Sequence, residues 1–303
     1  PSFYHPHRPA WIIINLNVEK LKSLKNKNDM FNVFDMKKLA FVLFGALLLS
    51  SCSLFKLDNY DAPKETLYGK VTDVKTGDPV LTDQGSEGIR VRLIETSWEG
   101  NVTPQDFNCR PDGTFRNTKL FEADYNIRVD GPFVPIVLED GDGNLVGDKS
   151  VNIHVKGSTE VNFEVQPFLK VEFVGSPTIS AGKITANVKV TRATTRDELA
   201  SAMEATKTWK DAYANVTDIQ LFVSRSSSVG YRARDTRWSS ELKYTGAAFE
   251  TELGKPVRIR SNGTIPSGQK VFIRAAARIN YDTPAGSGTR RWNYSEAVEI
   301  DVP

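Results

Sequence analysis

The sequence predicts an all-β protein made of two consecutive β-sandwich domains, and three observations lead to this expectation. Apolar and polar residues alternate in many short segments, which is the period of a half-buried strand. Glycine, proline and aspartate separate these segments, as they do in sandwich folds. A single segment, residues 196–213, instead places its apolar residues at helical spacing.

The first sandwich is predicted at residues 64–168, where six short segments alternate. These segments are Leu67–Val74, Ile89–Leu93, Thr114–Arg116, Tyr125–Val129, Val151–Val155 and Val161–Val165. Turn residues separate them: Lys75–Pro79 follows the first segment, and Pro111–Gly113 precedes the third. Strands of this length joined by tight turns are typical of two sheets packed face to face.

The second sandwich is predicted at residues 169–303 by the same pattern. Its expected strands are Leu169–Phe173, Ile184–Val190, Ile219–Val223, Val271–Ile279 and Trp292–Val302. The closing stretch Tyr294–Ile300 is similar to the last strand of a fibronectin-III or immunoglobulin-like sandwich. Residues Arg196–Tyr213 are expected to form a helical insertion, since Asp197 and Glu198 stand in its first turn, where the helix dipole favours negative charge.

A lipoprotein signal peptide is predicted at residues 36–51, directly before Cys52. Met36-Lys37-Lys38 supplies a positive start, residues 39–49 are apolar, and small residues precede the cysteine. This order resembles a bacterial lipoprotein signal, in which the cysteine is lipidated and begins the mature protein. A membrane-spanning helix is the alternative, but residues 39–49 fall short of the about 20 apolar residues that a span needs.

Residues 1–35 precede this signal, and we expect them to be translated upstream sequence or the product of a wrong start, outside the fold. Residues 52–63 are expected to form a tether between the lipid and the first sandwich. The tether contains Asp58 and Asp61. It resembles the acidic signals that favour export of Bacteroidetes lipoproteins to the cell surface.

The charge balance excludes a nucleic-acid partner. The whole chain has 39 Lys+Arg and 37 Asp+Glu, a net charge of +2. Without the seven basic and three acidic residues that precede Cys52, 32 basic and 34 acidic residues remain, a net charge of −2. Binding to a phosphate backbone needs a strong basic excess, so we expect no nucleic acid among the partners.

Residues that could carry catalysis are scarce. Only His154 of the three histidines lies beyond the signal, and we expect it on the outer face of its strand. Cys109 is the one cysteine besides Cys52, so we expect no intramolecular disulfide and a buried, unreactive thiol. The sequence contains no phosphate-binding glycine-rich loop motif. We expect no enzyme activity and no cofactor; a pair of glycosidase carboxylates among the acidic residues is the alternative that the sequence leaves open.

The densest acidic segment is Glu139–Asn144, which has two interpretations. Asp140, Asp142 and Asn144 have the spacing of the first ligands of a calcium loop. The glycine and the glutamate that an EF-hand loop requires further on are missing. A hairpin turn is therefore favoured, since Asp-Gly pairs adopt the backbone angles of tight turns, and a calcium site is the alternative.

Exposed aromatic residues are the feature that carbohydrate binding at a sandwich surface needs, because sugar rings pack on aromatic faces. Two polar stretches, residues 224–240 and 280–292, combine aromatic residues with arginines. The candidate carbohydrate-binding residues are Tyr231, Arg234, Arg237, Trp238, Tyr281 and Trp292, with Trp98 and Trp209 as further aromatic candidates. Core packing is the alternative for any single tryptophan. Tyr231 and Trp238 are predicted to be exposed because arginines flank them. These arginines suggest an acidic glycan, and an exposed loop whose charges serve solubility is an equally compatible interpretation.

Several motifs together carry a resemblance to a known family. Gly69–Pro79 reads G-x-V-x-D-x-x-T-G-x-P and Asp112–Phe115 reads D-G-T-F, which resembles the carboxypeptidase-regulatory, transthyretin-like module. Ile219–Ser224 reads I-Q-L-F-V-S, and Tyr294–Ile300 reads Y-S-E-A-V-E-I. With the signal and the acidic tether, this order resembles the two-domain Bacteroidetes lipoprotein family of the domain-of-unknown-function 3823 type. The resemblance covers nearly all of the chain from Cys52 onward.

The resemblance implies a transthyretin-like first domain, an immunoglobulin-like second domain and a place beside an outer-membrane transporter complex of the starch-utilisation type. We therefore expect a lipid-anchored outer-membrane protein that faces the cell exterior and binds polysaccharide or oligosaccharide without acting on it. A structural or adhesive spacer of the envelope is one alternative. A glycan-degrading enzyme is the other.

Overall fold

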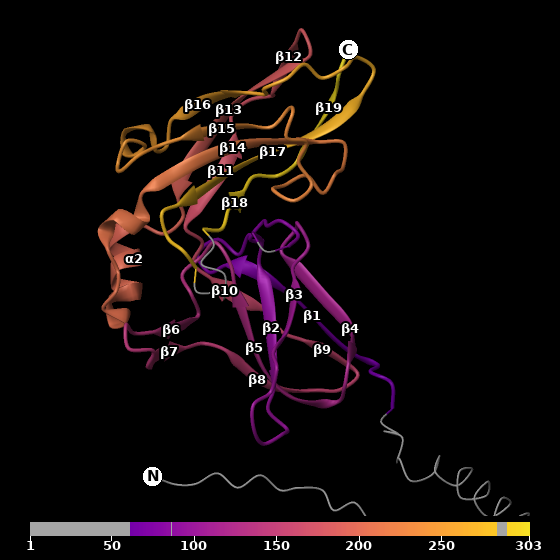
Figure 1. Ribbon diagram of the computed structural model, residues 1–303, viewed down its shortest axis with the longest axis vertical. Coiled ribbons are helices and arrows are strands. Elements are labelled where there is room, and N and C mark those ends of the chain that lie inside the picture. The colour runs from indigo at the N-terminus through magenta and orange to yellow at the C-terminus, as the bar shows by residue number, and fades with distance from the viewer. Residues whose placement is uncertain (1–60, 86, 284–289) are drawn as a thin grey trace, which may run out of the picture. The chain divides into compact units, whose positions relative to one another are not determined.

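The computed structural model describes residues 61–85, 87–283 and 290–303 (Figure 1). The predicted signal peptide at residues 36–51 and the lipidated Cys52 lie outside the described residues. So do the upstream segment 1–35 and residues 52–60 of the tether. The described residues form several sheets of mostly short strands, which confirms the all-β prediction. None of the described helices is long and apolar enough to span a bilayer.

The first sandwich consists of two sheets. In one sheet, β1 (Glu65–Asp73) pairs antiparallel with β4 (Thr114–Leu120) and parallel with β9 (Ser158–Glu160) and β10 (Phe163–Val165). The other sheet has the order β3-β2-β5-β8, formed by β3 (Gln105–Asn108), β2 (Arg90–Glu95), β5 (Ala123–Asp130) and β8 (Val151–Val155). The strands predicted from alternation are all present in these two sheets.

The inner faces of these sheets bury every second residue, as the strand period requires. On β1, Leu67 and Val71 are fully buried, and Gly69 lies between them on the same face. A Cβ atom at Gly69 would lie 1.7 Å from the carbonyl oxygen of Val161. The first strand therefore needs glycine at this position, because any side chain would push it away from the neighbouring chain.

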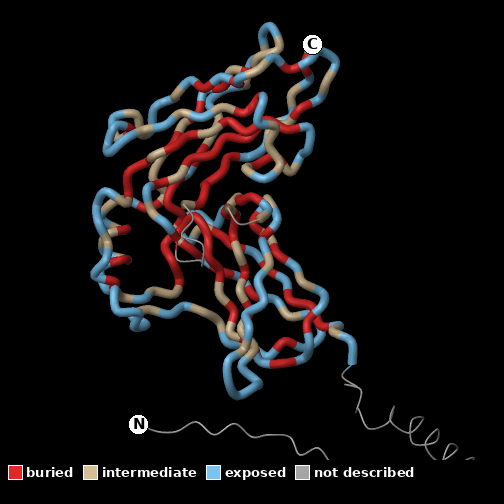
Figure 2. The backbone as a smooth tube through the Cα atoms, in the orientation of Figure 1, coloured by how far each residue is buried: buried red, intermediate tan, exposed pale blue. Residues whose placement is uncertain are grey.

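The second sandwich also consists of two sheets. In one, β13 (Lys183–Arg192) pairs with β11 (Leu169–Phe173), β12 (Thr178–Ser180) and β16 (Pro256–Arg260). In the other, β14 (Val216–Ser224) lies between β15 (Ser240–Lys243) and β17 (Lys270–Ile279), and β17 pairs with β18 (Asn293–Tyr294) and β19 (Val298–Asp301). Figure 2 shows that buried residues follow the strands, whereas exposed residues gather in the connecting loops.

The strands that the sequence did not predict are short and largely exposed. They are β3, β9, β12, β15, β16 and the hairpin strands β6 (Val137–Glu139) and β7 (Leu145–Asp148). β3 shows the reason, because none of its four residues is buried and its sequence therefore lacks alternation. Such edge strands are stabilised by their neighbours rather than by an apolar pattern of their own.

The predicted helical insertion is present but broken. The α-helix α2 (Arg196–Met203) begins with a capping box, in which the Thr195 side chain accepts from the backbone N–H of Glu198. After Met203 the chain continues as two 3₁₀ turns, η3 (Glu204–Thr206) and η4 (Asp211–Ala214). The prediction of one helical segment up to residue 213 is therefore wrong, because Lys207 adopts left-handed backbone angles that end the helical segment.

Buried polar contacts join the two sandwiches. Arg274 of β17 is 3% exposed and donates hydrogen bonds to the carbonyl oxygens of Thr82 at 2.6 Å and Pro111 at 3.2 Å. Asn293 of β18 donates from its amide nitrogen to the carbonyl oxygen of Pro132 at 3.0 Å. The contacts within residues 62–303 make them one compact unit. The domain boundary between residues 168 and 169 therefore stays a prediction.

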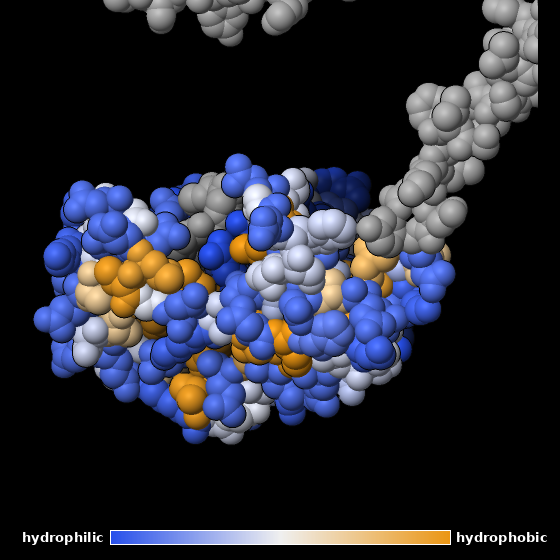
Figure 3. All heavy atoms as spheres, turned by 90° about the horizontal axis from the view of Figure 1, so that it is seen from below, coloured by the Kyte–Doolittle hydropathy of each residue, from blue (hydrophilic) through white to orange (hydrophobic). Residues whose placement is uncertain are grey.

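The surface is mainly polar where Figure 3 shows it. Hydrophilic residues cover most of that face, and apolar residues form only small separate patches. A broad apolar patch would indicate a protein or membrane contact. The face in Figure 3 gives no such indication, so polar ligands are the ones to consider there.

Candidate functional site

Two of the predicted carbohydrate-binding residues are buried. Trp238 is 3% exposed and packs in the core of the second sandwich, with the guanidinium groups of Arg225 and Arg237 at 5.3 and 5.1 Å from its ring centre. Trp292 is 0% exposed and packs edge to face on Phe222. The prediction that Trp238 is exposed is wrong, because arginines cover a ring as readily as they keep it near water. Neither tryptophan presents a face to a sugar.

The other candidates of the stretch 224–240 contact residues of that same stretch. The guanidinium carbon of Arg234 lies 3.9 Å from the ring centre of the half-buried Tyr231 and so occupies one face of it. Arg237 forms an ion pair with Asp235, with a nitrogen–oxygen distance of 2.6 Å. Sugar binding by Tyr231, Arg234 and Arg237 stays a prediction, but contacts within the loop account for the positions of all three side chains without a ligand.

Tyr281, by contrast, lines a cavity, which we call the polar pocket. Its volume is about 280 Å³, and its walls come from β5, the β6–β7 hairpin, the chain that follows α2, and the segment after β17. The lining residues are Arg128, Asp130, Val137, Leu138, Glu139, Asp140, Met203, Thr206, Thr208 and Tyr281. This volume is close to the lower end of the range for small-molecule sites, about 300–1,000 Å³, and suits a small unit such as one sugar ring.

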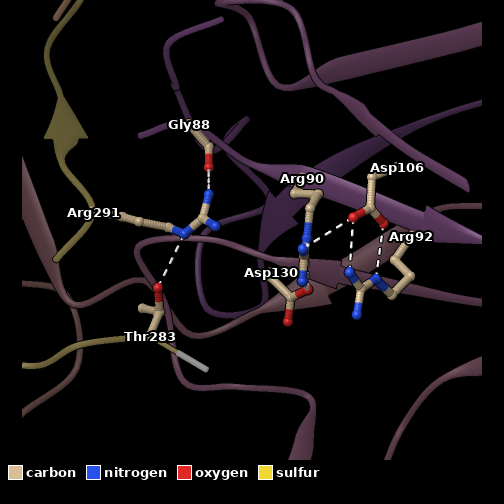
Figure 4. Close-up of polar contacts among 7 residues, drawn as sticks. All are labelled: Gly88, Arg90, Arg92, Asp106, Asp130, Thr283 and Arg291. Carbon is tan, nitrogen blue, oxygen red and sulfur yellow. Dashed lines mark hydrogen bonds and ion pairs between the residues drawn. The ribbon is translucent and has the colours of Figure 1, made fainter. Parts of the chain in front are cut away.

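Figure 4 shows a ladder of arginines and aspartates on the outer face of β2, β3 and β5. It includes Asp130, which lines the polar pocket. Arg92 holds both oxygens of Asp106, with two nitrogen–oxygen distances of 2.8 Å. Arg90 contacts Asp106 at 3.0 Å and Asp130 at 2.8 Å. The Arg92 hydrogen bonds hold the pKa of Asp106 below its usual value, so the carboxylate stays charged and fixed.

Arg128 continues this ladder into the polar pocket, and its pairing is incomplete. It lies directly across β2 and β5 from Arg92. Its Nε atom is buried and has no hydrogen-bond partner among the described residues. A buried donor without a partner costs about 1–3 kcal/mol, so such an atom normally bonds to a water or a ligand. The Arg128 guanidinium is thus a donor that the protein itself does not use fully.

The acidic segment 139–144 forms the turn of the β6–β7 hairpin, as the favoured interpretation predicts. The Oδ1 atom of Asp140 accepts from the backbone nitrogens of Asp142 at 3.0 Å and Asn144 at 2.8 Å. Hydrogen bonds from the side chain and backbone of Asn144 lower the pKa of Asp140. In the part of the chain that the structure describes, no three His, Cys, Asp or Glu side chains are grouped as metal ligands.

Three half-buried aromatic rings pack together beside the polar pocket, and we call them the aromatic trio. Trp209 lies 5.8 Å from Tyr213 and 5.5 Å from Tyr281 between ring centres, and Tyr213 lies 6.0 Å from Tyr281. Tyr281 also contacts the buried Phe168 at 5.9 Å, which fixes its ring. Aromatic rings in such tilted and edge-on pairs are rigid, and rigid rings supply contact area at a low entropic cost.

Burial raises the pKa of Tyr281 to about 12, with smaller contributions from Tyr213 and Asp282. The phenol therefore stays neutral at physiological pH and keeps a hydroxyl group that can both donate and accept. Thr206 and Thr208, which are linked by a hydroxyl–hydroxyl distance of 3.1 Å, add further groups of this kind. Glu139 and Asp140 of the β6–β7 hairpin add acceptors to the lining.

A larger cavity of about 480 Å³ lies elsewhere, between the turn after β1 and strand β11. Its lining includes Pro79, Val80, Leu81, Leu169 and Val171. Its lining also contains polar residues, among them Asp73, Asp78, Lys170, Glu172 and Asn293, but none of these described side chains has a buried polar atom without a partner, as Arg128 has in the polar pocket. The polar pocket is therefore the better candidate, although it is smaller.

The remaining reactive groups have structural surroundings. Cys109 is 1% exposed, and burial raises the pKa of its thiol to about 12, so it is a protonated core residue as predicted. His154 is exposed on β8, and its Nδ1 atom lies 2.8 Å from Asp124. A hydrogen bond to Asp124, then one to Glu122, raises its pKa. Its outward position on the strand confirms the prediction.

Comparison with known proteins identifies the family. Residues 65–166 match the family model described as the N-terminal domain of a protein of unknown function, DUF3823. A crystal structure of a DUF3823 family protein from Bacteroides uniformis ATCC 8492 is 60% identical, with 80% of this chain and 100% of that chain covered and a TM-score of 0.78. The chain belongs to the DUF3823 family. No protein with a curated description matches it.

Two more distant structures share the fold of this DUF3823 protein. One, also from Bacteroides uniformis ATCC 8492, is described as a "putative carbohydrate binding protein"; it is 20% identical, with 79% of this chain and 100% of that chain covered and a TM-score of 0.56. The other is a DUF3823 family protein from Parabacteroides merdae ATCC 43184, 19% identical, with 80% and 100% covered and a TM-score of 0.53. At these identities the likeness concerns the fold alone.

Sequence reasoning for this DUF3823 protein found Tyr281 and named Trp209 as a further aromatic candidate, but it missed Arg128 and Tyr213. Arg128 alternates with buried neighbours on β5 and looks like any exposed strand residue. Tyr213 and Trp209 lie in a segment whose helical spacing suggested a plain insertion. Their spacing could have indicated a buried role, since two aromatic residues four positions apart in a polar insertion are unusual for a solvated helix.

Proposed function

We propose that this protein is a non-enzymatic glycan-binding lipoprotein that holds a sugar unit in the polar pocket. The observation that carries the proposal is the aromatic trio packed beside a cavity lined by both donors and acceptors. Sugar hydroxyl groups donate and accept at once, so a lining that contains Arg128 and threonine hydroxyls as well as Glu139 and Asp140 suits them. Tyr281 supplies an apolar surface for the C–H face of the ring.

Several facts support a binding protein over an enzyme. Asp130, the most buried carboxylate of the pocket, is held by Arg90 at 2.8 Å. Both Nε and Nη2 of Arg90 contact the same oxygen of Asp130, so this carboxylate is held in one position by the protein itself. One structural relative is also described in terms of carbohydrate binding, although it shares only 20% of its sequence with this chain.

The cellular setting is part of the same proposal. Lipidation of Cys52 anchors the protein in the outer membrane, residues 53–63 hold the sandwiches away from the bilayer, and the protein faces the cell exterior. There it acts as an accessory to a transporter complex of the starch-utilisation type and presents captured glycan to it. Incorporation of radiolabelled palmitate into the wild-type protein, and its loss in Cys52→Ser, tests the anchor.

Affinity electrophoresis tests the binding site. We expect the Cys52→Ser protein to be retarded in gels that contain its polysaccharide, screened among neutral glucans, mannans, xylans and galactans. Arg128→Gln and Trp209→Ala should each weaken this binding about tenfold or more, because the first removes a donor from the pocket lining and the second removes the ring that holds Tyr281 in place. Trp98→Ala is the matched control, since Trp98 is 59% exposed on a loop of the first sandwich away from the pocket lining.

Three outcomes would overturn the proposal. If no glycan retards the protein, a structural or adhesive spacer becomes the better description. If reducing sugar is released, the protein is an enzyme. If Trp98→Ala weakens binding as much as Trp209→Ala while circular dichroism shows all variants folded, the sugar binds at another place.

A further inference from the structure

A second candidate site lies on the outer face of the sheet formed by β4, β1 and β9 (Figure 1). A shallow depression of about 290 Å³ opens there. We call it the basic face, and its polar lining consists of Tyr68, Lys70, Arg110, Thr114, Arg116, Glu160 and Asn162. None of these residues lines the polar pocket, so the two sites share no side chain.

The sheet register arranges the basic face in two rows. In the first row, Tyr68 of β1 stands directly opposite Arg116 of β4 and Glu160 of β9. In the second row, Lys70 stands opposite Thr114, and its backbone nitrogen donates to Asn162 at 3.0 Å. Arg116, directly opposite Tyr68 in an antiparallel pair, has its Cβ atom about 4.5–5.5 Å from that of Tyr68. Lys70 lies two residues further along β1 on the same face, about 7 Å away.

The positive charges of the basic face are not neutralised by carboxylates. Lys70, Arg110 and Arg116 are exposed, and none of them forms an ion pair with a described residue. Asp112 offsets part of the charge of Arg110, and Glu160 is the only carboxylate in the lining of the depression. In contrast, Arg90 and Arg92 beside the polar pocket are paired with aspartates. The basic face is therefore a local excess of positive charge.

Tyr68 gives the basic face an aromatic surface. The side chain is 36% exposed, which is unusual for so large a residue in the middle of a strand. Its hydroxyl group donates to Glu160 at 3.5 Å, and Glu160 accepts from Asn162 at 2.9 Å. The ring is thus oriented from one side by polar contacts, while its neighbours on the other side are cationic.

We infer that the basic face binds an anionic sugar unit of a polysaccharide, with the ring of the sugar on Tyr68 and its acidic group between Lys70 and Arg116. Guanidinium and ammonium groups form charge-assisted hydrogen bonds to carboxylates and sulfates, which are stronger than neutral ones. An exposed tyrosine between two cations supplies the apolar contact that an inorganic anion would not use. This site is independent of the polar pocket and goes beyond it, because it selects acidic glycans.

Affinity electrophoresis with polygalacturonate tests this inference on the Cys52→Ser protein. Polygalacturonate should retard the protein, whereas its fully methyl-esterified form and dextran should do so at least about tenfold more weakly. The double variant Lys70→Gln/Arg116→Gln, and separately Tyr68→Ala, should lose the retardation. Arg128→Gln should retain it, which separates a failure of this site from a failure of the polar pocket.

The matched control is Arg258→Gln/Arg260→Gln. These two exposed cations lie two residues apart on the edge strand β16 and flank the buried Ile259, so the variant removes the same charge without an exposed tyrosine beside it. The control should behave as the wild type. The inference is overturned if polygalacturonate does not retard the protein, or if the control variant loses retardation as the Lys70→Gln/Arg116→Gln variant does. It is also overturned if the esterified polymer binds as strongly as polygalacturonate, or if DNA fragments compete for the site as strongly as heparin does.

Discussion

At the scale of single residues, buried arginines hold this protein together more than its ion pairs at the surface do. Arg274 is 3% exposed and has no carboxylate partner within ion-pair distance among the described residues. Its guanidinium instead donates to the backbone carbonyls of Ser295, Thr82 and Pro111 and lies 4.6 Å from the ring centre of Tyr294. Burial lowers its pKa, but the carbonyl oxygens around it satisfy the charge.

Replacement of Arg274 tests this role. Arg274→Met keeps the apolar stem but leaves three carbonyl oxygens without their donor, and each unsatisfied group costs about 1–3 kcal/mol. We expect the free energy of unfolding in urea to fall by about 3 kcal/mol or more. Arg258→Met, on an exposed strand position, should change it by less than about 0.5 kcal/mol. Equal effects of the two changes would contradict the argument.

At the scale of elements, α2 depends on its first turn. Thr195 and Glu198 form a capping box, and the Nζ atom of Lys75 in the first sandwich lies 2.6 Å from Glu198. The Lys75 hydrogen bond, then the backbone hydrogen bond from Thr195, lower the pKa of Glu198 to about 2. This carboxylate therefore links the start of the helix to the turn that follows β1.

The lowered pKa of Glu198 predicts a pH dependence of stability. A carboxylate whose pKa is lower in the folded state stabilises it above the unfolded value of 4.5, and this contribution disappears as the pH falls to about 2. The difference in unfolding free energy between wild type and Glu198→Gln should thus shrink between pH 5 and pH 2 in urea titrations. Glu99→Gln, in an exposed loop, should show no such trend.

The elements also show what sequence can predict. The long strand β13 alternates clearly because one face is buried, and it was predicted. β17 was also predicted, although its residues 273–277 are buried on both faces. Edge strands such as β16 were missed, since neighbouring strands and not burial decide their position. The polar pocket escaped prediction for a related reason. Its residues come from β5, a hairpin and the end of α2, and only the register of distant strands brings them together.

At the scale of the whole molecule, the junction between the sandwiches is polar, buried and specific. Asp83, 1% exposed, accepts from the backbone nitrogen of Arg232 at 2.9 Å and from the Tyr294 hydroxyl at 3.5 Å. Burial raises the pKa of Asp83, and backbone hydrogen bonds from Arg232 and Gln84 offset part of this effect. Residues from both sandwiches are needed to satisfy these groups.

This junction predicts that residues 62–303 unfold as one unit. If either sandwich melted alone, the carbonyls and carboxylate of the junction would lose their partners, so separate melting is unfavourable. Differential scanning calorimetry should show a single transition whose calorimetric and van't Hoff enthalpies agree. Two resolved transitions would mean that the sandwiches are independent and that the contacts of Arg274 and Asp83 add little.

The buried Cys109 has a practical consequence. Its thiol is shielded and stays protonated, so maleimide dyes at neutral pH will leave it untouched. With Cys52→Ser in place, a cysteine introduced at Thr208, on the rim of the polar pocket, becomes the single labelling position on the molecule. A fluorophore attached there would report occupancy by its change in emission and would allow many glycans to be surveyed in solution.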